Sequence, residues 1–493
     1  MKVLYNNFQD LTWIKVFHKL NELYNFEPGL IIDKLKFINK SKNVFPNSSF
    51  LDMDECLLGF NKKGGEYLNI INHRIFKAHR NIAYDLLSRF STNNGDSFTD
   101  QEKEELYHRA IIFWYNYLRK KNFDLFICKL APHHFYDYII YLCCKILKIK
   151  TLFFSGTIIK YHFLLKSKIN NRSLIGYEKF KSKYQINKTQ SKFNHKNFLN
   201  DYINDKYINK KPWYIKKYQF LDNDFNKYII KSYLRLIINF FRLSFMRKSD
   251  FLMKKPKMKL EKSKIFFSKF DYDRYKIDTT NKKKRLFQFY NKISTYPDLK
   301  KRFVFFAAAY QPELSSSPAG GNFQDHFRTL SLIDKNLPND CLIYYKEHPT
   351  IFHPDLYMMG DIKRSEEYYR RLLTLKKLKF INIEQDSLDL IQNSLSTITI
   401  SGEVGFEALI ENRPSIVFSK TWYSSHNSVF YANNEKSFKK ALNNIQNKNY
   451  NFYDKNIFFD FFLKNALQIK PINDGGNLNK DDILNICYCL SNN

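Results

Sequence analysis

The amino-acid sequence predicts an α/β protein of two doubly wound domains joined by a basic, largely helical insertion. Buried strands alternate with amphipathic helices up to about residue 155, the alternation disappears between about 160 and 295, and it returns near residue 300. Strand, helix and strand with short connections are typical of a parallel sheet. We therefore expect an N-terminal domain over 1–160, an insertion over 161–298, a C-terminal domain over 299–450 and a helical extension over 451–493.

The N-terminal half contains one clear strand–helix–strand unit. Apolar residues at near-helical spacing predict a helix over 104–122. A strand over 123–130, a helix over 135–150 and a strand over 151–156 follow it. The turn APHH joins the first of these strands to its helix. This turn places His133, His134 and Asp137 near the carboxyl end of that strand.

The C-terminal half repeats the alternation more strongly. Asp386 precedes one apolar segment and can cap its helix. Helices are predicted over 323–337, 365–378, 386–394 and 406–412. Strands are predicted over 302–309, 341–347, 380–384, 396–400 and 414–418.

Composition excludes several classes of protein. With 493 residues, 44% apolar and 17% aromatic, the chain has the apolar surface that disordered chains lack. Its seven scattered cysteines fit neither a disulfide framework nor a Cys-rich zinc site. No apolar run reaches the roughly 18 to 20 residues that span a bilayer, and the N-terminus lacks a hydrophobic signal segment. We expect a cytoplasmic protein.

The net charge of +32 is concentrated in one segment. Residues 161–300 carry 35 Lys and Arg against 11 Asp and Glu, or +24, although AT-rich coding can supply part of this bias. Within the segment, 226–248 predicts a basic amphipathic helix, flanked by basic runs at 254–264 and 281–285. It is either a helical insertion with a solvated Lys face or a surface that docks on anionic lipid. Nucleic acid is not expected, because no RNP, zinc-finger or helix-turn-helix pattern accompanies the charge.

Three turns in the C-terminal half follow predicted strands, where open parallel sheets bind ligands. They are the small-residue loop 310–321, the Glu347-His348-Pro349 turn, and the 401–405 turn that opens into a helix. Small-residue loops and helix N-termini offer N–H groups to phosphate, although such loops and a turn histidine are also common without a ligand. The candidate substrate-binding residues are Gln311, Glu313, Ser316, Ser317, Gly320, Lys346, His348, Pro349, Ser401, Gly402, Glu403 and Glu407.

Aromatic and charged neighbours of these turns have two interpretations. Strand alternation sends Lys346 and Glu347 to opposite faces, so at most one of them lies easily on the ligand side. Trp422 and Tyr423 either pack on a base or sugar ring or belong to the core.

The sequence of residues 301–430 resembles the capsule polysaccharide biosynthesis proteins, bacterial surface-glycan glycosyltransferases that include Kdo transferases. The matching stretches are YQPELSSSPAGG, FQDHF, YYKEHP, Ser387 and TISGEVGFEALIENRPSIVFSKTWY. The stretch APHHFYDYIIYLCCKILKIKTLFF is similar to the family's Pro-His turn with an Asp on the following helix.

The resemblance implies a GT-B fold, two Rossmann-like domains facing a cleft, with the nucleotide-sugar donor mainly on the C-terminal one. It implies that His348 and Pro349 bind the nucleotide, that Glu407 binds ribose hydroxyls, and that Ser401 and Gly402 lie near the phosphates. It also implies a CMP-linked acid sugar such as Kdo as donor, with no cofactor and no metal. Consistently, the donor region has no Asp-X-Asp motif.

A group on the acceptor side must act as base or nucleophile. Asp137 is the leading candidate, with His133 and His134 as alternatives, unless Asp137 only caps its helix. The expected partners are a nucleotide sugar, a glycan or lipid-linked acceptor, and an anionic membrane surface that binds 161–300 at the inner face of the cell membrane. Two alternatives are a CDP-polyol phosphotransferase of similar fold and a catalytically silent glycan-binding scaffold.

Overall fold

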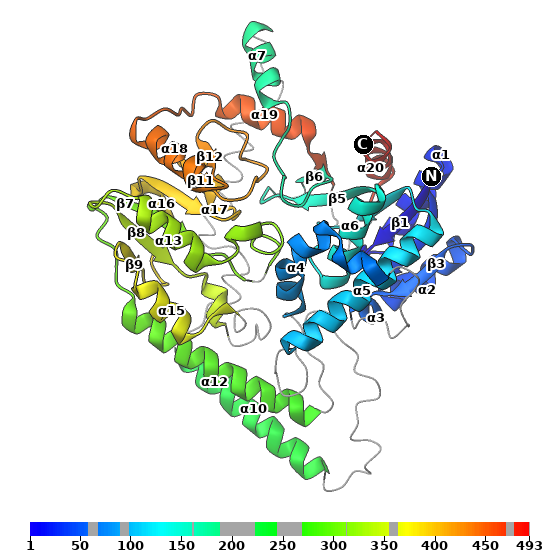
Figure 1. Cartoon of the computed structure of the whole chain (residues 1–493), viewed down its shortest axis with the longest axis horizontal. Coiled ribbons are helices and arrows are strands. Elements are labelled where there is room, and N and C mark those ends of the chain that lie inside the picture. The colour runs from blue at the N-terminus through cyan, green and yellow to red at the C-terminus, as the bar shows by residue number, and fades with distance from the viewer. Residues whose placement is uncertain are drawn as a thin grey trace. The chain divides into compact units, whose positions relative to one another are not determined.

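The chain, seen here in a computed structural model, divides into two compact units (Figure 1). The structure describes residues 1–57, 68–88, 98–159, 162–187, 222–243, 269–311, 313–353, 363–469 and 478–492. Unit 1 comprises Met1–Leu87, Phe98–Arg172 and Phe462–Asn493, and unit 2 comprises Ser88–Ser97 and Ser173–Phe461. Most of the expected insertion therefore belongs to unit 2, and most of the expected C-terminal extension to unit 1.

Unit 1 is built on a seven-stranded sheet with the strand order β13-β6-β5-β4-β1-β2-β3. The five strands from β5 to β3 in this order run parallel, and β6 and β13 pair antiparallel. Chain order reverses between β1 and β4, which makes their carboxyl ends a topological switch point. The strands are β1 (Lys2–Asn6), β2 (Glu27–Asp33), β3 (Ser49–Asp52), β4 (Leu125–Cys128), β5 (Lys150–Gly156), β6 (His162–Lys166) and β13 (Leu467–Gln468).

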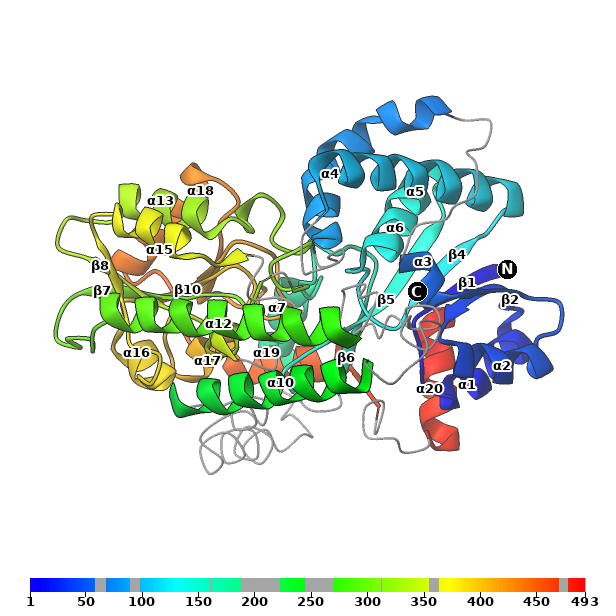
Figure 2. The ribbon, with the colours of Figure 1, turned by 90° about the horizontal axis from the view of Figure 1, so that it is seen from below.

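Helices cover both faces of this sheet (Figure 2). On one face, Trp13, Phe17, Phe37 and Ile486 pack on alternate residues of the strands. These residues come from α1 (Thr12–Tyr24), α2 (Leu35–Val44) and α20 (Lys480–Ser491). The other face carries α4 (Arg74–Leu87), α5 (Asp100–Lys121) and α6 (Phe135–Leu147). The shorter helices are α3 (Met53–Leu57) and the 3-10 turn η1 (Leu68–Asn72).

Unit 2 contains a six-stranded parallel sheet with the order β12-β11-β10-β7-β8-β9. Read from β9, this is the 3-2-1-4-5-6 order of dinucleotide-binding domains, with its switch point between β7 and β10. The doubly wound α/β class predicted from the sequence is thus confirmed. The strands are β7 (Phe303–Ala307), β8 (Leu342–Lys346), β9 (Leu378–Phe380), β10 (Ser396–Thr399), β11 (Ser415–Val417) and β12 (Val429–Tyr431).

The strand predicted over 380–384 was misplaced. β9 covers Leu378–Phe380, and beyond it only Ile381 continues the pairing, through a bridge to Thr295. The chain then turns, with the Gln385 N–H donating to the Asn382 carbonyl. The apolar FINIE run is therefore divided between the end of a strand and a turn.

The helices of unit 2 form two layers around the sheet. One layer consists of α13 (His326–Asn336), α15 (Glu366–Leu373) and α18 (Glu435–Gln446), which share the larger core cluster. The opposite layer consists of α16 (Ser387–Asn393) and α17 (Val404–Ile410). The helix predicted from residue 323 begins at His326 because Asp325 caps it, after a 3-10 turn η4 (Gly321–Phe323). α19 (Lys455–Asn465) follows β12 and α18.

Three further helices come from the expected insertion: α7 (Tyr177–Asn187), α10 (Asp222–Leu243) and α12 (Lys269–Ile293). α10 and α12 lie side by side as a hairpin (Figures 1 and 2). The basic run 281–285 lies within α12, whereas 244–248 and 254–264 lie outside the described residues. In the part of the chain that the structure describes, no helix has both the length and the apolar character that crossing a membrane requires.

Candidate functional site

The three predicted turns of unit 2 lie together at the carboxyl edge of its sheet. They follow β7, β8 and β10, which are neighbours in the sheet. The Ser401 hydroxyl donates a hydrogen bond to the Ser315 carbonyl, which joins the third turn to the first. The ring centroids of Tyr310 and His348 lie 5.6 Å apart, which joins the first turn to the second. The predicted residues thus gather at the switch point of the sheet.

The small-residue loop is closed on itself. The N–H groups of Ser316 and Ser317 both donate to the Glu313 carbonyl, at 2.8 and 2.7 Å. Gly320 packs against the end of β10, where a Cβ atom would lie 2.5 Å from the Ser316 carbonyl oxygen and 2.8 Å from Ile400. These N–H groups hold the loop together, and the glycine is required for close packing.

A buried ion pair supports the His348 turn. Glu347 and Arg364 have fully buried side chains, and the guanidinium binds both carboxylate oxygens, with Nε–Oε2 at 2.6 Å and Nη2–Oε1 at 3.2 Å. The hydroxyls of Tyr345 and Tyr369 donate to the same carboxylate. Burial raises the pKa of Glu347, but the charge and hydrogen bonds of Arg364 outweigh burial and hold this pKa below its ordinary value. Glu347 is therefore an anchor on the buried side of the strand.

Gln311, a predicted substrate-binding residue, belongs to this buried network. Its Oε1 accepts a hydrogen bond of 2.8 Å from Arg364 Nη1, and its Nε2 donates to the Gln324 carbonyl. His326 Nδ1 accepts from Arg364 Nη2 at 3.2 Å. Burial, together with the Arg364 charge, lowers the pKa of His326 far below its ordinary value, so this imidazole is neutral. Arg364 and His326 were not predicted from the sequence, because no local pattern links them to the turn.

His348 has a defined orientation and charge. Its backbone N–H donates to Glu347 Oε1 at 3.0 Å, and its ring Nδ1 is hydrogen-bonded to the Thr350 hydroxyl. Burial lowers the pKa of His348 to about 4, and the charges of Lys346 and Arg364 add to this effect against the opposing charge of Glu347. The half-buried ring is thus a neutral hydrogen-bonding group at pH 7.

Lys346 lies at the end of β8 and points to the next turn of the sheet. Its Nζ donates to the Gln385 carbonyl at 2.5 Å and to the Ser387 hydroxyl at 3.0 Å. Ser387 begins α16, and Asp386 caps that helix as predicted. Lys346 therefore contacts the turn before α16, whereas Glu347 contacts the buried Arg364, as strand alternation predicts.

The third turn rests on aromatic side chains. Trp422 Nε1 donates to Glu403 Oε2 at 3.2 Å, and the Tyr423 hydroxyl donates to the Gly402 carbonyl. Both rings are buried, so the core interpretation of Trp422 and Tyr423 is the one that the structure supports. A Cβ atom on Gly405 would lie 2.7 Å from the Tyr423 hydroxyl, which explains this glycine. The half-buried Glu407 lies in the first helical turn of α17, directly after this loop.

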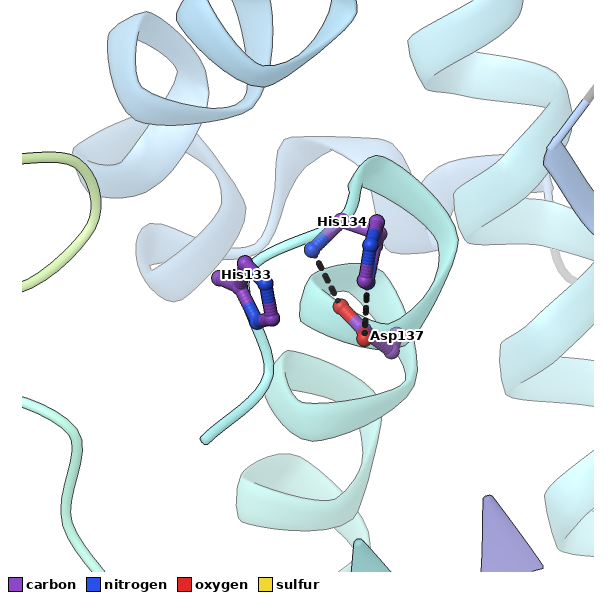
Figure 3. Close-up of side chains that lie close together, drawn as sticks. All are labelled: His133, His134 and Asp137. Carbon is purple, nitrogen blue, oxygen red and sulfur yellow. Dashed lines mark hydrogen bonds and ion pairs between the residues drawn. The ribbon is translucent and has the colours of Figure 1, made fainter. Parts of the chain in front are cut away.

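In unit 1, His133, His134 and Asp137 form a cluster at the carboxyl end of β4 (Figure 3). The His134 N–H donates to Asp137 Oδ1 at 2.8 Å, and the His134 ring nitrogen Nδ1 lies 3.1 Å from Oδ2. His133 Nδ1 donates to the Ala131 carbonyl at 2.7 Å. Asp137 is buried and closes a capping box at the start of α6. Asp137 therefore does cap its helix.

The same geometry also suits proton transfer. A carboxylate bound to an imidazole fixes the orientation and tautomer of that ring, as in acid–base pairs of enzymes. One ligand atom from each of the three residues lies within 4.8 Å of the others, so the cluster also has the donor set for a metal ion. The sequence analysis expects no metal here.

A second feature of this edge was missed by the sequence analysis. Asp33, at the end of β2, is fully buried and accepts hydrogen bonds from the N–H groups of Phe8 and Gln9 in the β1–α1 loop. Burial raises the pKa of Asp33 to about 6, despite these hydrogen bonds. Asn7 and Gln9 have φ of 61° and 59°, a left-handed conformation that is uncommon outside glycine. The sequence signal that could have identified Asp33 is its position directly after the apolar LII run.

Comparisons with known proteins agree with the motifs. Residues 316–460 match the family model described as capsule polysaccharide biosynthesis protein. No curated protein matches the chain.

Solved structures with some likeness include two structures of KpsC from Thermosulfurimonas dismutans. One is the KpsC beta Kdo 2,7 transferase (TM-score 0.33, 10% identity, 94% of this chain and 100% of that chain covered). The other is the KpsC beta Kdo 2,4 transferase (TM-score 0.24, 16% identity, 43% and 63% covered). The UDP-GlcNAc 2-epimerase from Methanocaldococcus jannaschii is a third (TM-score 0.24, 13% identity, 92% and 94% covered). The family model thus matches residues 316–460, and this region of the chain is similar to the capsule polysaccharide biosynthesis proteins, the family that the sequence resembles.

Proposed function

We propose that this protein is a glycosyltransferase of surface polysaccharide biosynthesis that uses a nucleotide-sugar donor. One observation carries the proposal: the region that matches the capsule polysaccharide biosynthesis family contains two of the three turns and the second half of the other, and these turns gather at the switch point of a sheet with the 3-2-1-4-5-6 order. Nucleotides bind at this place in open α/β sheets. The donor we propose is a CMP-linked acid sugar such as Kdo, and the acceptor is a glycan or lipid-linked glycan.

The donor site uses the half-buried face of these turns. His348 offers a neutral imidazole, and a neutral ring can hydrogen-bond a base or phosphate without a change of charge. Lys346 supplies a positive charge near the start of α16. Glu407 would bind ribose hydroxyls, and Ser401 and Gly402 would lie near the phosphates. The leaving nucleotide would be stabilised by these groups without a metal ion.

The acceptor side uses the His133, His134 and Asp137 cluster. Asp137 is held by two hydrogen bonds from His134, which limits it to one orientation. In this proposal the carboxylate or its paired imidazole takes the proton from the acceptor hydroxyl, or the carboxylate attacks the sugar as a nucleophile. We place the enzyme at the inner face of the cell membrane, where lipid-linked acceptors are found.

A panel of nucleotide sugars tests the proposal. The protein is incubated with CMP-, UDP-, GDP- and CDP-linked donors, and release of the nucleotide is measured with and without glycan acceptors. We expect nucleotide release from one class of donor, and CMP-sugars are the leading candidates. Sugar transfer should continue after a chelator is added. Release of polyol phosphate from a CDP donor would support the phosphotransferase instead, and no release from any donor would favour the silent scaffold.

The variant Asp137→Asn separates catalysis from capping. Asparagine keeps an oxygen for the His134 N–H, so we expect a stability cost of about 1 kcal/mol or less. Transfer should fall by roughly 10²- to 10⁴-fold, because the base or nucleophile is gone. The control is Asp100→Asn, an exposed acid in the first turn of α5, which should change neither property. Full transfer by Asp137→Asn would remove this residue from the mechanism.

A further inference from the structure

Within the part of the chain that the structure describes, one face of the hairpin helix α10 packs against α12 and another, apolar face is exposed. Phe225 and Ser232 are buried on the side of α12, where the rings of Phe225 and Phe287 lie 5.8 Å apart. On the other side, five large apolar residues are each about half exposed. We call them the apolar stripe: Ile230 (59%), Tyr233 (47%), Leu234 (54%), Ile237 (48%) and Ile238 (50%).

The stripe is continuous along the helix. Its members follow the 3- and 4-residue spacing that places side chains on one helical face. Of the seventeen large apolar side chains that are exposed in the described part of the chain, five lie within these nine residues. Scattered exposed apolar residues are ordinary, but a contiguous group marks an interaction surface.

Positive charge accompanies the stripe. Lys227, Lys231 and Arg235 are exposed at four-residue intervals and so form a row along the same helix. Between Phe225 and Ser249 the sequence has six Lys and Arg and no Asp or Glu. An apolar face beside a cationic row is the pattern of a helix that lies in the interface of an anionic membrane. A second copy of the chain is disfavoured as occupant, because two such rows would repel each other.

The hairpin is joined firmly to the donor turn within unit 2. The Tyr290 hydroxyl of α12 accepts the Glu347 N–H at 3.0 Å and donates to the Ile381 carbonyl at 2.9 Å. Lys283, fully buried, donates to the His353 carbonyl at 2.9 Å, and the rings of Phe287 and Phe352 lie 5.5 Å apart. Both ends of the 3-10 turn η5 (Pro349–Phe352) are therefore held by α12.

We propose that the apolar stripe of α10 inserts into the interfacial region of an anionic lipid bilayer, and that the α10–α12 hairpin holds the His348 turn in a fixed orientation to that surface. The proposal deepens the proposed function, on which it rests for the meaning of the His348 turn. The stripe supplies the apolar contact, and the lysines and arginine supply attraction to lipid phosphates. A helix docked in this way sets the distance between the membrane and the donor turn.

Vesicle binding of the full chain tests the proposal. Sedimentation is measured with vesicles of phosphatidylglycerol and phosphatidylcholine, and with vesicles of phosphatidylcholine alone, at low and high salt. We expect binding to the anionic vesicles that weakens with salt. The double variant Leu234→Asp/Ile237→Asp should bind them roughly tenfold or more weakly, because the apolar contact is lost. Lys231→Glu/Arg235→Glu should lose the preference for anionic lipid.

The control is Leu373→Asp, which introduces one such negative charge at a 49% exposed leucine on α15 and should bind vesicles like the native chain. Because the stripe faces solvent, the stripe variants should keep the native melting temperature and any nucleotide-induced rise in it. Unchanged vesicle binding by both double variants would overturn the proposal. So would a native dimer that the Leu234→Asp/Ile237→Asp variant dissociates without any change in lipid binding. If the native chain binds no nucleotide, the donor-site assignment is contradicted, but the conclusion from vesicle binding is unaffected.

Discussion

At the residue scale, the donor turn depends on one buried carboxylate. Glu347 receives two hydrogen bonds from Arg364 and one each from Tyr345 and Tyr369. Burying a carboxylate is costly unless its charge is paired and its oxygens are hydrogen-bonded, and here both conditions are met. The backbone N–H of the adjacent His348 donates to this carboxylate. The position of His348 is therefore set by a charge pair on the other side of the strand.

Removal of Arg364 tests this dependence. Arg364→Ala leaves Glu347 charged and buried without its partner, and we expect the free energy of unfolding of unit 2 to fall by about 3 to 5 kcal/mol. Denaturant unfolding measures the change. Arg370→Ala is the control, since Arg370 has a 60% exposed side chain and a long contact of 3.8 Å to Glu366. It should change the same quantity by less than about 0.5 kcal/mol. Equal losses in the two variants would contradict the role of the buried pair.

At the element scale, α12 belongs to the core of unit 2 although its sequence is strongly basic. Leu286 and Tyr290 are members of the larger core cluster, and the Lys283 side chain is fully buried. The sequence predicts an insertion over 161–298 because the alternation of strands and helices stops there. The buried positions of α12 could not be recognised from its composition, because lysines and aromatic residues are interleaved along the helix.

The variant Tyr290→Phe tests whether α12 supports the donor turn. The phenyl ring keeps the packing, but the buried Glu347 N–H loses its acceptor, so we expect a loss of about 1 to 3 kcal/mol in the free energy of unfolding. The nucleotide-induced rise in melting temperature should also decrease, because the His348 turn is less well fixed. The control is Tyr296→Phe, just beyond the same helix, where the ring is 66% exposed. A Tyr290→Phe protein with native stability would show that this contact is dispensable.

The sequence predicted the elements better than their long-range contacts. Apolar runs and helical spacing located β4, α6, β5, β7, β8 and β10 to within a few residues, because these signals are local. They could not locate the Arg364–Glu347 pair or the hydrogen bonds that Asp33 accepts from the β1–α1 loop, since these contacts join residues 17 to 25 positions apart without a repeating pattern. The three turns were found because each directly follows a strand, but the inward orientation of Gln311 was not predictable.

At the scale of the whole molecule, the positive residues behind the net charge of +32 include two kinds. Some, such as Lys283, are buried and hold the hairpin to unit 2. Others, such as Lys231 and Arg235, are exposed beside the apolar stripe of α10. The matched region 316–460 carries the second and third turns that we assign to the donor, and residues 316–321 of the first. Charge therefore bears on where the protein works, and the turns bear on what it binds.

The most direct test of the donor site is the melting temperature of the full chain with and without CMP or CDP. A nucleotide at about 100 times its dissociation constant adds about 2.7 kcal/mol, or a rise of several degrees for units of this size. We expect this rise in the native protein and in the control His18→Ala, an exposed histidine of α1, and we expect none in His348→Ala. No rise in the native protein with any nucleotide, or a full rise in His348→Ala, would contradict the account.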